Sequence, residues 1–159
     1  MESLLFPLTF LAAIGSGLMA GLFYIFSTVI MRSLDSLPPP QGLAAMKAIN
    51  ITIVNPLFLT IFLGTAVLCV ALIILALLKW SGAPSVWLIA GSLIYLAGSI
   101  AVTMIFNVPL NNVIEATALD SAQAGAVWAR YMAEWVPWNH VRSVACTASL
   151  ACFIMALRA

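Results

Sequence analysis

Residues 55–78 read NPLFLTIFLGTAVLCVALIILALL, a stretch without a single charged side chain. A helix needs about 20 predominantly apolar residues to cross the hydrocarbon core of a bilayer. The Asn-Pro pair at the start is typical of a helix N-terminus, because asparagine caps free backbone N–H groups and proline fits the first helical position. The stretch therefore predicts a membrane-spanning helix over residues 56–78.

Three further segments have the same apolar character. They predict membrane-spanning helices over about residues 5–31, 84–106 and 138–157. The chain is 64% hydrophobic and only 7% charged, whereas about a quarter of a soluble domain is charged. Lipid must therefore cover most of the outer surface. The sequence predicts an all-α fold, an integral membrane four-helix bundle with up-down topology that forms a single domain over residues 1–159.

The longest connection, residues 107–137, has structure of its own. Within it, residues 121–135 predict an extra amphipathic helix between the third and fourth spans. Its aromatic and apolar side chains share one face at helical spacing, namely Trp128, Tyr131, Met132 and Trp135. A helix of this kind either lies in the membrane interface or covers a pocket.

Charge distribution predicts the orientation in the membrane. The side that holds the two long connections carries Arg32, Lys47, Arg130 and Arg142, and the other side carries Lys79 and Arg158. The positive-inside rule then places the long connections in the cytoplasm and both termini outside. We expect a multi-pass protein of a bacterial inner (plasma) membrane.

The same composition limits the partners. A net charge of +1 provides no field for a polyanion, so we expect no nucleic acid. Membrane lipid and a small lipophilic molecule fit better. The Gly17-x-x-x-Gly21 spacing is typical of close helix packing, within one chain or in a homo-oligomer.

Uncommon polar and aromatic side chains concentrate at one end of the predicted bundle. Polar groups at membrane depth are costly unless they face a cavity or a partner, so this cluster is a candidate site. Its members are Tyr24, Ser27, Thr28, Arg32, Asn50, Asn55, Asn107, Asn111, Asn112, Asn139, His140 and Arg142, and Trp128, Trp135 and Trp138 lie near them in the sequence.

Several members also have simpler explanations. Asn55 is well placed to be a helix cap. His140, the only histidine, is either an anchoring polar residue or a functional group. Arg142 lies about 200° around a helix from His140, so we expect it to point elsewhere, toward the lipid headgroups. The three tryptophans form an aromatic belt or enclose a flat ring. One histidine and cysteines inside apolar spans do not predict a metal site.

Three short motifs carry a resemblance to a known family. They are Gly21-Leu22-Phe23-Tyr24, Asn107-Val108-Pro109-Leu110-Asn111 and Trp135-x-x-Trp138-Asn139-His140-Val141-Arg142. With the four-helix plan, they resemble the anthrone oxygenase family, also called domain of unknown function 1772, in a bacterial-type member. The resemblance implies oxidation of a lipophilic polycyclic phenol or anthrone by molecular oxygen, without a cofactor.

The implied chemistry needs a base, donors for an oxyanion and a dry slot for a flat ring. With this resemblance, the cluster suggests His140 as the base and Asn107, Asn111 and Asn139 as donors, with Arg142 as an electrostatic stabiliser. The slot would be lined by Tyr24, Asn55, Trp128, Trp135 and Trp138.

Two other functions remain open at this point. The same cluster would suit a non-enzymatic binding or accessory protein for a quinone, a lipid or a partner subunit. A transporter or channel subunit would need polar residues through the middle of the membrane, and the second and fourth spans hold little there beyond Cys, Thr and Ser.

Overall fold

The computed structural model describes residues 4–159, so the first three residues of the predicted domain lie outside the described range. The regular elements of the described residues are all helical. In chain order they are α1 (Leu5–Ile25), η1 (Phe26–Ile30), α2 (Met31–Asp35), α3 (Pro39–Ile53), α4 (Pro56–Leu78), α5 (Ala83–Tyr95), η2 (Leu96–Ala101), η3 (Thr103–Asn107), α6 (Val108–Ala116) and α7 (Ala124–Arg158). The three η elements are π-helical.

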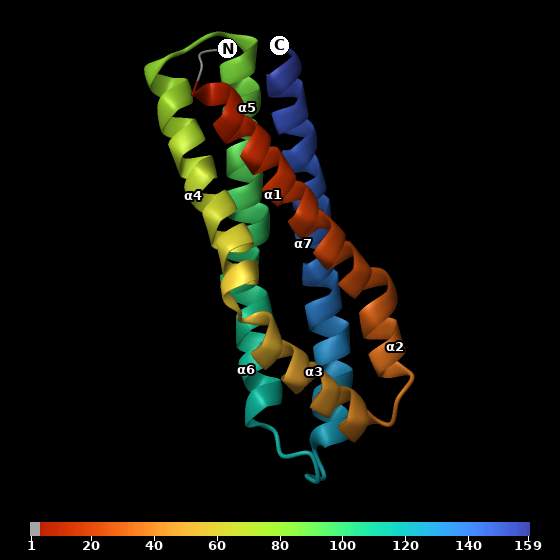
Figure 1. Ribbon diagram of the computed structural model, residues 1–159. Coiled ribbons are helices and arrows are strands. Elements are labelled where there is room, and N and C mark those ends of the chain that lie inside the picture. Colours follow the sequence, from red (N-terminus) through yellow and green to blue (C-terminus); the bar gives the residue numbers. More distant parts are fainter. Residues whose placement is uncertain (1–3) are drawn as a thin grey trace.

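Consecutive elements join into four long rods that run up and down the bundle (Figure 1). The rods are Leu5–Asp35, Pro56–Leu78, Ala83–Ala116 and Ala124–Arg158, and each is long and apolar enough to cross a membrane. The predicted all-α bundle with four spans is thereby confirmed, and the chain has the character of a multi-pass membrane protein. The first rod ends at Asp35, beyond the predicted end at residue 31.

Small residues bring the rods close together. A Cβ atom added to Gly91 would lie 2.9 Å from the Cβ of Cys152, and one added to Gly98 would overlap Ala145. In lipid, where no hydrophobic effect drives helices together, such close contact is a main source of packing energy. The glycines of the third span therefore serve close helix packing. By contrast, a Cβ on Gly21 would meet no atom within 4 Å.

The third span is longer than predicted. We expected a helix over residues 84–106 with Pro109 beyond its end, yet the helix continues to Ala116 through η2, η3 and α6. In a π turn the carbonyl of residue i accepts from the N–H of residue i+5, and here the Val108 N–H donates to the Thr103 carbonyl. Pro109 follows this turn and has no N–H to donate. Because the π turn has already replaced the regular i to i+4 hydrogen bonds at this point, the missing N–H does not end the helix.

The separate surface helix over residues 121–135 is also corrected. Residues 124–158 form one helix, α7, with Pro137 inside it. An interior proline costs a helix about 3 kcal/mol. Here burial of Trp128, Tyr131 and Trp135 against the bundle opposes that cost. The aromatic face is therefore core and does not lie in the membrane interface.

The additional helix lies elsewhere, as α3 between the first and second spans. It crosses the end of the bundle opposite the two termini (Figure 1) and contacts α2, α6 and α7. Lys47 fastens it by donating to the carbonyls of Glu115 (3.0 Å) and Thr117 (2.6 Å) at the end of α6. Gly42 lets it approach Trp128, since a Cβ there would lie 3.0 Å from the indole. This end of the bundle is thus covered by α3, and the site lies beneath it.

Candidate functional site

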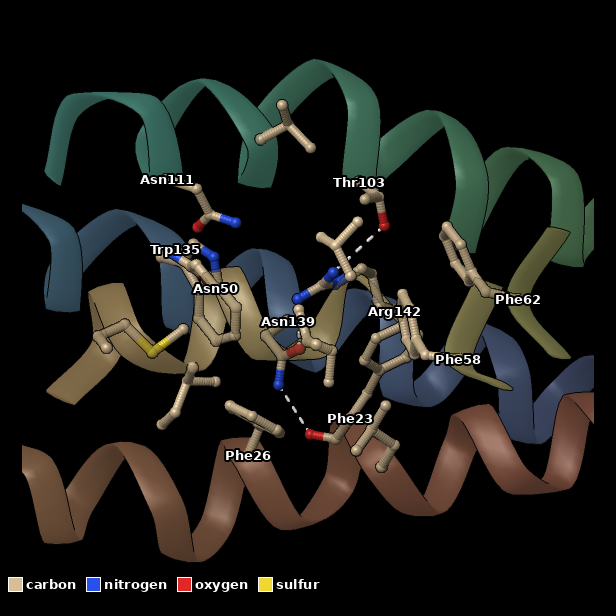
Figure 2. A pocket seen from close by; sticks show the side chains of 16 residues that line it. Phe23, Phe26, Asn50, Phe58, Phe62, Thr103, Asn111, Trp135, Asn139 and Arg142 are labelled. Carbon is tan, nitrogen blue, oxygen red and sulfur yellow. Dashed lines mark hydrogen bonds between the residues drawn. The ribbon is translucent and has the colours of Figure 1, made fainter. Parts of the chain in front are cut away.

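A cavity of about 150 Å³ lies between α3 and the bundle (Figure 2). All four rods and α3 contribute to its wall. The lining residues are Leu22, Phe23, Phe26, Met46, Ile49, Asn50, Ile53, Val54, Phe58, Phe62, Thr103, Val108, Asn111, Trp135, Asn139 and Arg142. The wall is therefore mostly apolar and aromatic, with a few polar groups, as is typical of small-molecule sites.

Arg142 lies at the centre of this cavity (Figure 2) and is only 6% exposed. One terminal nitrogen, Nη2, donates to Asn139 Oδ1 at 2.6 Å, and the other, Nη1, donates to Thr103 Oγ1 at 3.2 Å. The guanidinium carbon is 4.3 Å from the centre of the Phe23 ring and 5.0 Å from that of Trp135. Two neutral acceptors and two aromatic faces thus hold the cation in a fixed orientation.

No carboxylate among residues 4–159 pairs with this guanidinium. The Arg130–Glu134 pair, at 2.8 Å, lies on an exposed face of α7. A buried cation without a counter-ion costs several kcal/mol, because neutral acceptors replace only part of its hydration. The cavity is therefore electrostatically unbalanced, and an anion would bind there with the attraction that a low dielectric strengthens.

Three buried N–H groups of residues that line the cavity have no acceptor within the described chain. They belong to Arg142 Nε, Trp135 Nε1 and Asn50 Nδ2. Buried donors are nearly always paired in folded proteins, so a group of unpaired ones indicates an acceptor supplied from outside the chain. Since all three are donors, the matching ligand group is an oxygen acceptor such as a carbonyl, a phenolate or an enolate.

Asn139 orients Arg142 and is itself fully hydrogen-bonded. Its Nδ2 donates to the Phe23 carbonyl and to Ser27 Oγ, both at 2.7 Å, while Oδ1 accepts from Arg142. Ser27 lies in η1 and Thr103 in η3. The polar side chains of α7 are thus held by two π turns of neighbouring rods, an irregularity that often occurs at functional sites.

Asn107 and Asn111 have separate structural settings. Asn107 is fully buried and donates to the Trp135 carbonyl at 3.2 Å, but it does not line the cavity. Asn111 does line it, and its Oδ1 accepts from the Tyr131 hydroxyl at 2.8 Å. Of the two, only Asn111 is placed to contact a ligand.

The three tryptophans do not enclose one ring. Trp135 lines the cavity. Trp128 is buried behind it and donates to Asp35 Oδ1 at 3.1 Å, which ties α7 to the end of α2. Trp138 stacks on Phe106 outside the cavity, with ring centres 3.6 Å apart. The alternative that all three sandwich a flat ligand is therefore not the arrangement in this structure.

Three predicted site residues lie on the outer surface. Tyr24 is 61% exposed, and His140 is also exposed. Asn55 caps α4 by accepting from the Phe58 N–H at 3.0 Å, the simpler of its two interpretations. None of the three lines the cavity.

The side chains of His140 and Arg142 point in different directions from α7, as predicted. The expectation that Arg142 points toward the lipid headgroups is wrong. Arg142 lies three residues after Asn139 and shares its face of α7, and that face is turned inward.

Asn50 belongs to the predicted polar cluster but was given no role in the site, and Thr103 and Phe23 were not predicted as site residues. Thr103 belongs to a polar stripe with Ser99 and Asn107 at four-residue spacing on the third span. Asn50 is one of the few amides beside an apolar segment. Nothing in the sequence distinguishes Phe23 from its apolar neighbours. Among residues 4–159, no three His, Cys, Asp or Glu side chains gather closely enough to hold a metal ion.

Comparison with known proteins identifies the family. No curated protein and no solved structure matches the chain. The family model described as anthrone oxygenase matches residues 58–152, which extend from the first turn of α4 through most of α7. The match includes the polar wall of the cavity at Thr103, Asn111, Trp135, Asn139 and Arg142. Because more than half of the sequence is matched, this chain belongs to the anthrone oxygenase family.

Proposed function

We propose that the cavity binds a lipophilic phenol or anthrone as its oxyanion and that molecular oxygen oxidises the bound substrate without a cofactor. The observation that carries this proposal is the buried Arg142, which lines the cavity, has no carboxylate partner in the described chain and has an unpaired Nε–H. Family membership supplies the reaction class.

The residues on the wall suit the ionised substrate. An anthrone is a three-ring ketone with a methylene carbon opposite its carbonyl, and loss of a methylene proton places negative charge on the carbonyl oxygen. Arg142 Nε and Trp135 Nε1 have no acceptor in the described chain, and in our proposal they donate to that oxygen when the substrate is bound. Donors that are fixed before the reaction stabilise developing charge without reorganising, and more strongly in a dry site.

The reaction balances without a resident redox group. The enolate gives one electron to molecular oxygen, and the two radicals combine to form a C–O bond and a peroxide. The peroxide anion takes up a proton to become a hydroperoxide. Loss of the remaining proton on that carbon, with cleavage of the O–O bond, then leaves a ketone and hydroxide, and the hydroxide takes up a second proton to become water. In total the methylene carbon loses two hydrogens and gains one oxygen atom.

Proton removal requires a revision of the roles inferred from sequence. His140 is exposed and outside the cavity, so our proposal gives it no part in the chemistry. The described lining residues include no histidine, carboxylate or lysine. We therefore propose that Arg142 lowers the free energy of the enolate and that water accepts the proton.

The test compares variants of Arg142 in lipid nanodiscs supplied with a hydroxylated anthrone. Arg142→Gln removes the charge, and we expect anthraquinone formation to fall by at least about 100-fold, the usual effect of losing an oxyanion donor. Arg142→Lys keeps the charge without the planar fork and should retain intermediate activity. His140→Ala is the control and should stay within about twofold of wild type. A fully active Arg142→Gln protein, or an inactive but folded His140→Ala protein, would overturn the assignment.

A binding protein without turnover is the second candidate. The lack of a side-chain base among the described lining residues favours it. Oxygen uptake under single-turnover conditions separates the two functions, because a binding protein would hold the oxyanion and consume no oxygen.

A further inference from the structure

The cavity has a polar end and an apolar end (Figure 2). Asn50, Asn111 and Trp135 lie on one side of Arg142, whereas Phe58 and Phe62 lie on the other. A ligand with one charged oxygen would therefore place that oxygen at Arg142 and its apolar part toward the two phenylalanines. The position of this apolar end relative to the membrane decides how such a ligand arrives.

The length of α4 indicates how deep the cavity lies in the bilayer. Its 23 residues span about 35 Å at 1.5 Å per residue, close to the roughly 30 Å of a hydrocarbon core. The other three rods, of 31 to 35 residues, reach beyond it. Phe58 and Phe62 lie in the first two turns of α4, and Val54 directly precedes that helix. The apolar end of the cavity therefore lies near the boundary of the hydrocarbon core.

The wall is thin at the junction of α3 and α4. α3 ends at Ile53 and α4 begins at Pro56, so the residues between them form no helical turn. Val54 lines the cavity, yet it is 65% exposed, and Leu22 on α1 is half-buried beside the same cavity. The neighbouring surface includes Ile51 and Leu57, which are 68% and 71% exposed, and the exposed polar residues Thr52 and Asn55. An opening of the cavity between Leu22 and Val54, a lateral mouth, would face acyl chains.

The size of the cavity makes this mouth necessary for larger ligands. A volume of about 150 Å³ corresponds to roughly one benzene-sized guest. Building on the proposed function, we propose that substrates enter laterally from the bilayer through the mouth between Leu22 and Val54. One oxygen-bearing ring lies at Arg142 while the rest of the molecule stays in lipid. The ligand class is a phenol or enol that has a hydrophobic part extending away from its oxygen.

Chain-length dependence tests this inference by binding alone, with oxygen excluded. The probes are 4-alkyl-2-nitrophenols, whose phenolates are coloured, added to the protein in lipid nanodiscs. If the chain stays in lipid, affinity expressed per ligand dissolved in the lipid should change by less than about threefold from ethyl to dodecyl, because burying the chain in acyl chains adds no further transfer free energy. Loss of binding for the longer chains would show a closed cavity and overturn the proposal.

A blocked mouth provides the second measurement. Val54→Trp should weaken the dodecyl probe by at least about tenfold and the ethyl probe far less. Leu57→Trp is the matched control, since Leu57 is equally exposed nearby but does not line the cavity. Equal effects of the two substitutions would overturn the mouth. Lateral binding without oxygen uptake from an anthrone would instead refute only the oxygenase, so the two failures are distinguishable.

Discussion

Replacing Asn139 by leucine should lower both the free energy of unfolding and the affinity for a ligand. Leucine has nearly the same size, but it removes three hydrogen bonds, at 2.7, 2.7 and 2.6 Å, the last of them to a charged group. With about 1 kcal/mol for a neutral bond and about 2 for the charged one, the sum is about 4 kcal/mol. Hydrogen bonds between membrane helices average about 0.6 kcal/mol, so the loss of three of them should cost at least about 2 kcal/mol of the free energy of unfolding.

Asn107→Leu is the matched control. Asn107 is equally buried, but it makes a single hydrogen bond, at 3.2 Å, and its Oδ1 has no partner. Removing an unpaired buried oxygen offsets part of the lost bond, so we expect a cost below about 1 kcal/mol. Reversible unfolding by SDS in bicelles measures both free energies. Binding of 4-ethyl-2-nitrophenolate should weaken at least about tenfold in Asn139→Leu, because Arg142 loses its anchor, and should change little in Asn107→Leu. Similar free energies and affinities for the two variants would refute the reasoning.

Four other substitutions give predictions of different kinds. Trp135→Phe should weaken nitrophenolate binding by about tenfold and leave unfolding unchanged within about 1 kcal/mol, because its indole N–H has no partner in the described chain; spectrophotometric titration and SDS unfolding measure the two quantities. Gly98→Ala should destabilise the bundle by about 1–3 kcal/mol through overpacking, whereas Gly21→Ala, in open space, should stabilise it by about 0.5–1 kcal/mol. Thr103→Asp adds a carboxylate beside the guanidinium and should lower nitrophenolate affinity by at least about tenfold in the same titration; Thr52→Asp, exposed and outside the cavity, controls for the added charge.

The sequence predicted the spans well because each one is decided by its own composition. A run such as residues 56–78 cannot leave the bilayer without exposing apolar surface to water, whatever the rest of the chain does. The ends of helices were less predictable because they depend on neighbours. Pro109 and Pro137 both read locally as helix breaks, yet a π turn accommodates the first and aromatic burial opposes the cost of the second.

The inward face of α7 was predictable in principle, but the rule differs from that of a soluble helix. Asn139, Arg142 and Cys146 lie at helical spacing and are buried, while Val141 and Val144 are exposed. In lipid the apolar residues face outward, and the small and polar ones face the bundle. A reading that starts from His140 as the conspicuous polar residue selects the lipid side. The pair at i and i+3, Asn139 and Arg142, was the better signal.

Much of the cavity is invisible to any local reading, because its wall is assembled from distant segments. The family match begins at residue 58, so the contributions of α1 and α3, including Phe23 and Asn50, lie outside it. The sequence indicates that a polar end exists. Only the packing of α3 across the bundle shows which polar groups end up without partners.

The unpaired donors connect the folding of this bundle to its proposed chemistry. A bundle selected for stability alone would gain by replacing Arg142 with an apolar residue and Trp135 with phenylalanine, since buried groups without partners cost free energy. Here Asn139, two π turns and two aromatic rings hold the cation in place instead. An oxyanion that enters from the lipid side would supply the missing charge and acceptor together. Part of the cost of burying the cation would then return as binding free energy when substrate occupies the cavity.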